Sequence, residues 1–137
     1  MFGKVTYNED ERHHSRPNIV VINTHEQYIK FLEEDDRICV IKFYASWCKS
    51  CQRFGLSYRA LAFEEGDRID VDGSVLHLGN ARFAEVEYTA AAKLCKSLKV
   101  RKLPTVHMYK NHPNKDKIKF IVLPIVREVL HTVCDIA

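Results

Sequence analysis

Two cysteines separated by two residues, Cys48 and Cys51, are the side chains of this sequence best suited to chemistry. If a helix begins at Cys48, the two sulfurs lie about one turn apart on the same side of it. The free N–H groups at a helix N-terminus favour a thiolate at Cys48. Such a thiolate can attack a disulfide, and the sulfur of Cys51 can then resolve the mixed disulfide. Zinc and iron–sulfur sites use the same spacing, so the two cysteines alone also permit a metal site.

The residues in front of this pair predict a buried strand that delivers it. Val40, Ile41, Phe43 and Tyr44 form a run rich in β-branched and aromatic residues. Such a run suits a strand that is covered on both faces, as in the middle of a parallel sheet. A strand followed directly by WCKSC therefore predicts a cysteine pair at the carboxyl end of a central strand.

Two segments of the chain resemble the thioredoxin family. Residues 43–48, FYASWC, resemble the approach to that family's active site, and residues 100–105, VRKLPT, resemble its second signature. The resemblance extends from about Ile19 to the C-terminus, apart from one insertion. It implies an α/β thioredoxin fold with a central mixed β-sheet of four to five strands and helices on both faces. We therefore expect a flexible N-terminal arm over residues 1–17 and a single domain over residues 18–137.

The resemblance also implies roles for residues around the cysteines. Leu103-Pro104 is expected to be a cis peptide that faces the pair and turns the Leu103 backbone toward an extended client peptide. Trp47 is expected to pack beside the cysteines and to shape the contact surface. Lys49 adds a positive charge that favours the Cys48 thiolate. The residues expected to contact a client are Trp47, Lys49, Ser50, Leu103, Pro104 and Thr105.

The chain departs from the family's pattern beneath the second cysteine. Thioredoxins usually bury an aspartate in the central strand and pair it with a lysine on the neighbouring strand. The matching positions here are Lys42 and Glu85, so the charges are exchanged. An unpaired buried charge would cost several kcal/mol, and we therefore predict that the two side chains touch. Glu85 would then serve as the proton acceptor when Cys51 attacks.

Residues 66–80 exceed what the family needs at this point of the chain. Asp72-Gly73 lies between apolar residues, which is typical of a β-hairpin. The acidic residues do not follow a calcium loop, because Arg68 and Gly79 stand where its first and last acidic ligands belong. We predict an inserted surface hairpin or loop that selects a partner.

Capping signals place the helices. Thr24 with Gln27 three residues later predicts a capped helix, with Tyr28, Ile29 and Leu32 on its buried face. Thr89 is a candidate cap for a later helix, and Pro124 a candidate first residue of the last one. Cys39 and Cys95 are expected in the core, and Cys134 near the surface of the last helix.

Composition limits the partners and the compartment. A formal charge of +3 over 137 residues gives no argument for nucleic-acid binding, and the chain has no apolar run near ~18 residues that would span a membrane. Five irregularly spaced cysteines indicate a reducing compartment rather than a secreted disulfide framework. We therefore expect a monomer in the cytoplasm or an organelle stroma, a plastid included.

These observations predict a thiol–disulfide oxidoreductase that reduces client disulfides and is itself reduced by a reductase of the thioredoxin reductase type. It would use no metal and no organic cofactor. A positive Lys49 would make the couple less reducing, so isomerase or weak oxidant activity stays open. Two other classes also stay open. One is a metal or iron–sulfur protein, which would need a dimer because Cys48 and Cys51 supply two ligands of four. The other is an interaction module that binds through residues 66–80.

Overall fold

The computed structural model describes residues 15–111 and 117–122. The expected helix from Pro124, Cys134 and residues 1–14 of the expected arm lie outside these ranges. The elements are β1 Arg16–Pro17, β2 Ile19–Val21, α2 His25–Glu33, β3 Ile38–Tyr44, α3 Lys49–Glu65, β4 Arg68–Ile69, β5 Val75–His77, β6 Ala81–Glu87, α4 Ala92–Ser97, β7 Thr105–Asn111 and β8 Lys117–Val122.

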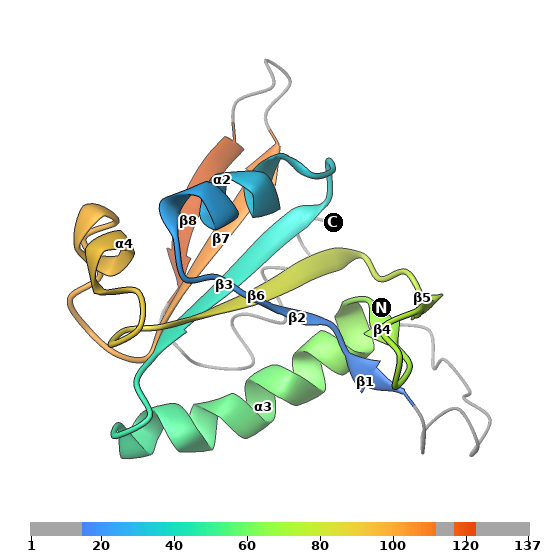
Figure 1. Cartoon of the computed structure of the whole chain (residues 1–137), viewed down its shortest axis with the longest axis horizontal. Helices are drawn as coiled ribbons and strands as arrows, with labels where there is room; N and C mark the ends of the chain where they lie inside the picture. The colour runs from blue at the N-terminus through green and yellow to red at the C-terminus, as the bar shows by residue number, and fades with distance from the viewer. Residues whose placement is uncertain (1–14, 112–116, 123–137) are drawn as a thin grey trace.

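A five-stranded mixed sheet forms the centre of the molecule, in the order β2-β6-β3-β7-β8 (Figure 1). The strands β2, β6 and β3 run parallel, and β7 and β8 are each antiparallel to their neighbour. The apolar strand predicted before the cysteines is β3, and it lies in the middle of this sheet. The predicted mixed sheet is therefore confirmed.

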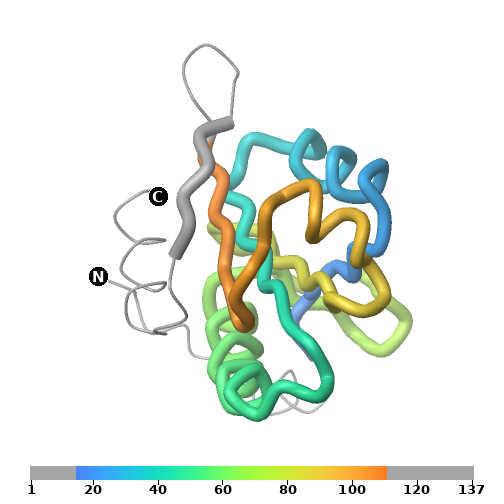
Figure 2. Tube along the Cα trace, turned by 90° about the vertical axis from the view of Figure 1, so that its left-hand side faces the viewer, coloured from blue at the N-terminus to red at the C-terminus, as the bar shows by residue number. Residues whose placement is uncertain are grey.

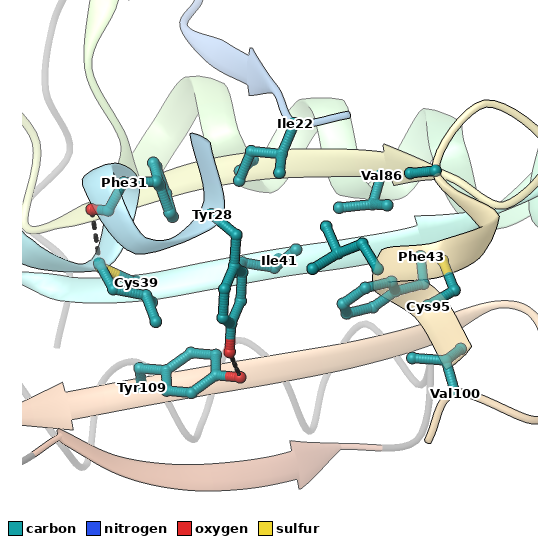
Figure 3. Packing of buried hydrophobic residues seen from close by; sticks show 14 residues of the cluster. Ile22, Tyr28, Phe31, Cys39, Ile41, Phe43, Val86, Cys95, Val100 and Tyr109 are labelled. Carbon is teal, nitrogen blue, oxygen red and sulfur yellow. Dashed lines mark hydrogen bonds between the residues drawn. The ribbon is translucent and has the colours of Figure 1, made fainter. Parts of the chain in front are cut away.

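Helices cover both faces of the sheet. The side chains of β3 alternate between the two faces and therefore contribute to two separate cores. Cys39, Ile41 and Phe43 pack against α2 and α4, whereas Ile38 and Val40 pack against α3. The side view separates these layers (Figure 2), and Figure 3 shows the first core. Cys39 and Cys95 are buried in this core, as expected.

The helix α2 is fixed at both ends by side chains. The predicted capping box is present, since Gln27 N–H donates to Thr24 Oγ1 at 3.2 Å and Gln27 Oε1 accepts from Thr24 N–H at 3.2 Å. At the other end, Glu34 accepts a hydrogen bond from Arg82 at 2.5 Å. This arginine offsets the unfavourable placement of acid at a helix C-terminus.

The buried face of α2 differs from the predicted one by one residue. Tyr28 and Leu32 are buried as expected, but Phe31 takes the place of Ile29, which is exposed. The hydroxyls of Tyr28 and Tyr109 form a hydrogen bond inside the core (Figure 3). A buried hydroxyl needs a polar partner, and here each tyrosine is the partner of the other. The bond thereby joins α2 to β7.

The inserted segment forms the predicted hairpin, with β4 and β5 antiparallel. Gly73 in its turn has φ +89°, a conformation that favours glycine. Arg16–Pro17, expected to end the flexible arm, instead form β1 and pair with β4. At the base of the hairpin, Asp67 accepts from Arg37 Nη1 at 2.5 Å and from the Gly79 N–H at 2.8 Å.

The helix α4 begins later than the Thr89 cap predicted. Its N-terminal flanking residue is Ala91, which makes no side-chain capping bond. The reason is Glu87, whose carboxylate accepts the Ala90 N–H at 2.7 Å and so stabilises a turn before the helix. Within residues 15–111 and 117–122, none of the helices combines the length and the apolar character that crossing a membrane requires.

Candidate active site

The two cysteines lie at the junction between the end of β3 and the start of α3. The strand ends at Tyr44, and Cys48 is the N-terminal capping residue of α3, with extended backbone angles (φ −90°, ψ 113°). Two hydrogen bonds stabilise the loop between the strand and the helix. Cys48 N–H donates to the Ala45 carbonyl at 3.2 Å, and Gln52 Nε2 donates to the Ser46 carbonyl at 3.1 Å. The expected start of the helix at the first cysteine is confirmed.

The sulfur of Cys48 forms hydrogen bonds with the first turn of α3. Cys51 N–H donates to Cys48 Sγ at 3.3 Å, and Ser50 Oγ lies 3.3 Å from the same sulfur. The hydrogen bonds with Cys51 and then with Ser50 lower the pKa of Cys48 below its ordinary value. Cys48 is also partly accessible to solvent. Both features favour a thiolate at this sulfur.

Cys51 has the opposite character, although it is only one turn away. Its side chain is buried, and burial together with the hydrogen bond to Cys48 raises its pKa. The charge of Lys42 acts the other way and lowers this pKa. Both cysteines are free thiols. The pair thus consists of one exposed sulfur that ionises readily and one buried sulfur that does so with difficulty.

The segment 103–105 closes the site from the start of β7. The Leu103-Pro104 peptide is cis, as expected, and Pro104 is buried. Cys48 Sγ donates to the Leu103 carbonyl at 3.9 Å, so this segment lies beside the exposed sulfur. Thr105 Oγ1 donates to the Lys102 carbonyl, which ties the turn before β7. The second signature and the cysteine motif, far apart in sequence, therefore form one site.

Lys42 and Glu85 form the predicted ion pair beneath the cysteines. They are register partners on β3 and β6, and Lys42 Nζ lies 3.4 Å from Glu85 Oε2. The lysine side chain is 6% exposed and the glutamate side chain 22%. Burial lowers the pKa of Lys42, and Glu85 partly opposes this.

Two residues of the motif face outward. Trp47 is 70% exposed and Lys49 is also exposed, so both side chains are accessible from solution. Lys49 was expected to favour the Cys48 thiolate through its charge. The side chains that do so by hydrogen bonding are instead Cys51 and Ser50.

Sequence reasoning missed the hydroxyl of Ser50 as a partner of Cys48 and the position of Gly55. A Cβ atom on Gly55 would lie 3.7 Å from Lys42 Nζ, an ordinary van der Waals distance, so the ammonium lies beneath α3 at this residue.

No cluster of three or more His, Cys, Asp or Glu side chains able to hold a metal ion occurs in the part of the chain that the structure describes. The described groups that form hydrogen bonds with Cys48 Sγ are the Ser50 hydroxyl, the Cys51 N–H and the Leu103 carbonyl.

Comparison with known proteins gives consistent matches. The family model described as Thioredoxin matches residues 19–121. The chain is 30% identical over 95 residues to Thioredoxin-like 2-2, chloroplastic, of Arabidopsis thaliana, and 26% identical over 95 residues to Thioredoxin-like 2, chloroplastic, of Oryza sativa subsp. japonica. Each match covers 69% of this chain but only 35% and 38% of the respective relative. The chain thus spans little more than a third of these curated relatives.

Solved structures agree on the fold. The structure of thioredoxin from Malassezia sympodialis matches with a TM-score of 0.65 at 20% identity, over 88% of this chain and 92% of that one. Thioredoxin from Fasciola hepatica matches with a TM-score of 0.66 at 20% identity, over 87% of this chain and 100% of that one. The arrangement of strands and helices is therefore shared with these proteins.

Proposed function

Because the chain belongs to the thioredoxin family, we propose that it is a thiol–disulfide oxidoreductase that reduces disulfides of client proteins at Cys48 and Cys51. The observation that carries this proposal is the pairing of two unlike thiols. One is partly exposed with a lowered pKa, and the other is buried with a raised pKa. Exchange requires a first sulfur that attacks readily and a second sulfur that reacts only after the mixed disulfide has formed.

The reaction conserves sulfur bonds and electrons. The Cys48 thiolate attacks one sulfur of a client disulfide, forms a mixed disulfide and expels the other client sulfur as a thiolate. Cys51 then attacks Cys48 Sγ, so that the Cys48–Cys51 disulfide forms and the second client thiolate leaves. Two electrons pass from the cysteine pair to the client. A reductase of the thioredoxin reductase type would return the pair to its dithiol form.

Residues beside the exposed sulfur would hold the client. The carbonyl of Leu103, which belongs to the cis peptide with Pro104, lies 3.9 Å from Cys48 Sγ. An extended client could pair with the Leu103 backbone. An exposed indole at Trp47 offers apolar contact area. Lys49, Ser50, Pro104 and Thr105 complete the proposed contact surface.

The setting of the protein is part of the proposal. We expect a monomer in a reducing compartment, and two relatives with chloroplastic in their names make a plastid stroma one candidate. No metal or organic cofactor takes part in the proposed exchange, which needs only sulfur and proton transfer.

Equilibration in glutathione or dithiothreitol buffers would test the activity. We expect one two-electron couple that disappears in Cys48→Ser, with a potential near thioredoxin's, about −270 mV. A potential near about −180 mV would indicate isomerase or oxidant work instead. If no titrating disulfide depends on Cys48, the proposed oxidoreductase function is wrong.

A second candidate role is partner binding through the inserted hairpin. Four apolar side chains of this segment are exposed, at Val71, Val75, Leu76 and Leu78. Exposed apolar side chains of one short segment form an interaction surface when they are contiguous. Replacing Val71, Leu76 and Leu78 with serine should abolish capture of a partner and leave the reduction potential unchanged. Equal capture by this variant would exclude the role.

A further inference from the structure

The first turns of α3 carry exposed positive charges beside the reactive sulfur. Lys49 and Arg53 follow Cys48 by one and by five residues, and both side chains are exposed. They are four residues apart and therefore lie on one face of the helix. The stretch of residues 45–63 contains three lysine or arginine residues and no aspartate or glutamate.

A second group of positive charges lies on the other side of the same sulfur. Lys99, Arg101 and Lys102 are exposed in the segment between α4 and Leu103. Residues 88–111 contain six lysine or arginine residues and no aspartate or glutamate. Cys48 Sγ donates to the Leu103 carbonyl at 3.9 Å, so this segment ends beside the sulfur. Figure 1 shows that the segment and the start of α3 lie at the same end of the sheet.

The backbone at Lys99 is one that glycine usually adopts. Its φ is 58°, its N–H donates to the Lys96 carbonyl at 3.1 Å, and the Val100 N–H donates to the Cys95 carbonyl at 3.0 Å. This is the closing turn of a helix that most often has glycine at the left-handed position. Lysine thus stands at a position that its backbone disfavours. A glycine there would remove the charge without disturbing the turn.

The carboxylates at this end of the sheet are already engaged. Glu85 pairs with Lys42 at 3.4 Å, and Glu87 accepts the Ala90 N–H at 2.7 Å. The exposed cations beside the sulfur form no ion pair with any residue that the structure describes. We call these five side chains the basic rim: Lys49, Arg53, Lys99, Arg101 and Lys102.

Negative charge is concentrated at the opposite end of the molecule. Residues 33–36, EEDD, precede β3 at its amino end, whereas the cysteines follow its carboxyl end. The seven residues of β3 span about 23 Å. The helix α3 has the same polarity, since its cations lie in the early turns and Glu64 and Glu65 end it. The positive side of this charge distribution therefore faces any partner that approaches the sulfurs.

We propose that the basic rim selects clients whose disulfide is flanked by acidic residues. The proposal rests on the oxidoreductase function and adds the class of substrate to it. A client must present its disulfide to Cys48, which brings the residues around that disulfide within about 10 Å of the rim, one Debye length at 0.1 M salt. Opposite charges accelerate this encounter, and like charges reject a basic client. The apolar surface of Trp47 offers contact to clients of either kind.

Peptides that differ only in the charge beside a disulfide test the proposal. Three peptides with the same disulfide-closed loop would carry glutamate, glutamine or lysine on both flanks. The fully reduced protein is mixed with each peptide, the reaction is quenched in acid, and the free peptide thiols are measured. Each rate constant is divided by that of dithiothreitol with the same peptide, because flanking charges also change the reactivity of the disulfide itself.

We expect the normalised rate constant of the acidic peptide to exceed that of the basic peptide at least about tenfold at 0.01 M salt. The ratio should approach one at 1 M salt, where the Debye length is only about 3 Å. The uncharged peptide should lie between the two.

Two double variants with the same change in net charge separate the rim from the rest of the surface. Lys99→Gly with Lys102→Gln removes two charges of the rim and should lower the acidic-to-basic ratio roughly threefold. Arg16→Gln with Lys30→Gln removes two exposed charges on β1 and α2 and should leave the ratio unchanged. Thermal melting reports whether each variant retains its fold.

The outcomes distinguish the client class from the activity itself. If wild type reduces all three peptides at equal normalised rates, or if the Arg16 and Lys30 variant lowers the ratio as much as the rim variant, the proposed selection is wrong and the oxidoreductase function stands. If wild type reduces none of the peptides faster than Cys48→Ser does, the oxidoreductase function is wrong and the client class falls with it.

Discussion

Ser50 gives the exposed cysteine a property that the charge of its other neighbour was expected to give. Its hydroxyl lies 3.3 Å from Cys48 Sγ. Together with Cys51 it lowers the pKa of Cys48. A hydroxyl that donates to a thiolate stabilises the ionised form, whereas an exposed lysine is screened by water.

We therefore predict that Ser50→Ala raises the pKa of Cys48 by roughly half a unit to one unit, the equivalent of one lost hydrogen bond. Lys49→Gln, at the adjacent exposed position, should change this pKa by less. The pH dependence of alkylation by iodoacetamide measures both. A larger effect of Lys49→Gln would restore the electrostatic explanation.

Residue types predict partners better than they predict contacts. The exchange of charge between Lys42 and Glu85 could be predicted, because a buried lysine requires a counter-charge and the strand register supplies one. The contact between Ser50 and Cys48 could not, since it depends on the rotamer of one hydroxyl in the first turn of α3.

At the scale of elements, the inserted hairpin is fixed at its base by close backbone packing. Gly79 lies so near the backbone of Glu65 and Gly66 that any Cβ at this position would overlap with it. Gly73 in the turn has a positive φ but open space around it. The two glycines are therefore required for different reasons.

We predict that Gly79→Ala destabilises the fold by more than about 2 kcal/mol, since backbone atoms must move apart. Gly73→Ala should cost about 1 kcal/mol, the usual price of a left-handed conformation for a residue with a Cβ. Urea denaturation measures both. Equal losses would show that packing at the hairpin base contributes nothing beyond conformation.

The junction of α2 and β7 depends on a hydrogen bond between Tyr28 and Tyr109. Tyr109→Phe should lower the free energy of unfolding by about 1–2 kcal/mol, because the Tyr28 hydroxyl is left buried without its partner. Removing both hydroxyls should cost less than the sum of the single changes. A double-mutant cycle measured by denaturant unfolding decides this, and strict additivity would contradict the contact.

Local signals predicted most elements and failed where a neighbouring carboxylate competed for a backbone N–H or where a distant segment of the chain paired with a strand. The capping box at Thr24 and the Asp-Gly turn are complete within a few residues, so both were predictable. The start of α4 was not, because Glu87 at the end of β6 takes over the Ala90 N–H. The pairing of Arg16–Pro17 with β4 joins segments about fifty residues apart, which no local pattern encodes.

For the whole molecule, one buried carboxylate makes stability depend on pH. Glu65 at the end of α3 is 3% exposed, and its Oε2 is buried without a hydrogen-bond partner among the described residues. Burial raises the pKa of Glu65 above its ordinary value of 4.5. Its contribution to stability is therefore complete below that value and is lost as the pH rises through the raised pKa.

We predict that Glu65→Gln stabilises the protein at neutral pH by about 1 kcal/mol, since an ionised oxygen no longer lacks a partner. The gain should vanish at a pH below 4.5, where the carboxyl is neutral in both states. Urea melts at several pH values measure it. Glu64→Gln, an exposed change of the same charge, is the control, and a gain that did not depend on pH would contradict the explanation.

The general architecture was the most predictable level, because the order of apolar strands and capped helices leaves few ways to cover both faces of one sheet. The position of the hairpin relative to the cysteines was not predictable, because it depends on the direction in which α3 runs along the sheet.

The length of α3 separates two ends with different exposed chemistry. Cys48 precedes the helix and the hairpin follows it (Figure 1), and 17 residues extend over about 25 Å. A protein bound at the hairpin would leave the sulfurs uncovered while keeping its own disulfides nearby. Its reduction would then proceed at the effective concentration set by that tether rather than at its concentration in solution. Selectivity among clients could thus arise far from the sulfurs, without any change in their reactivity.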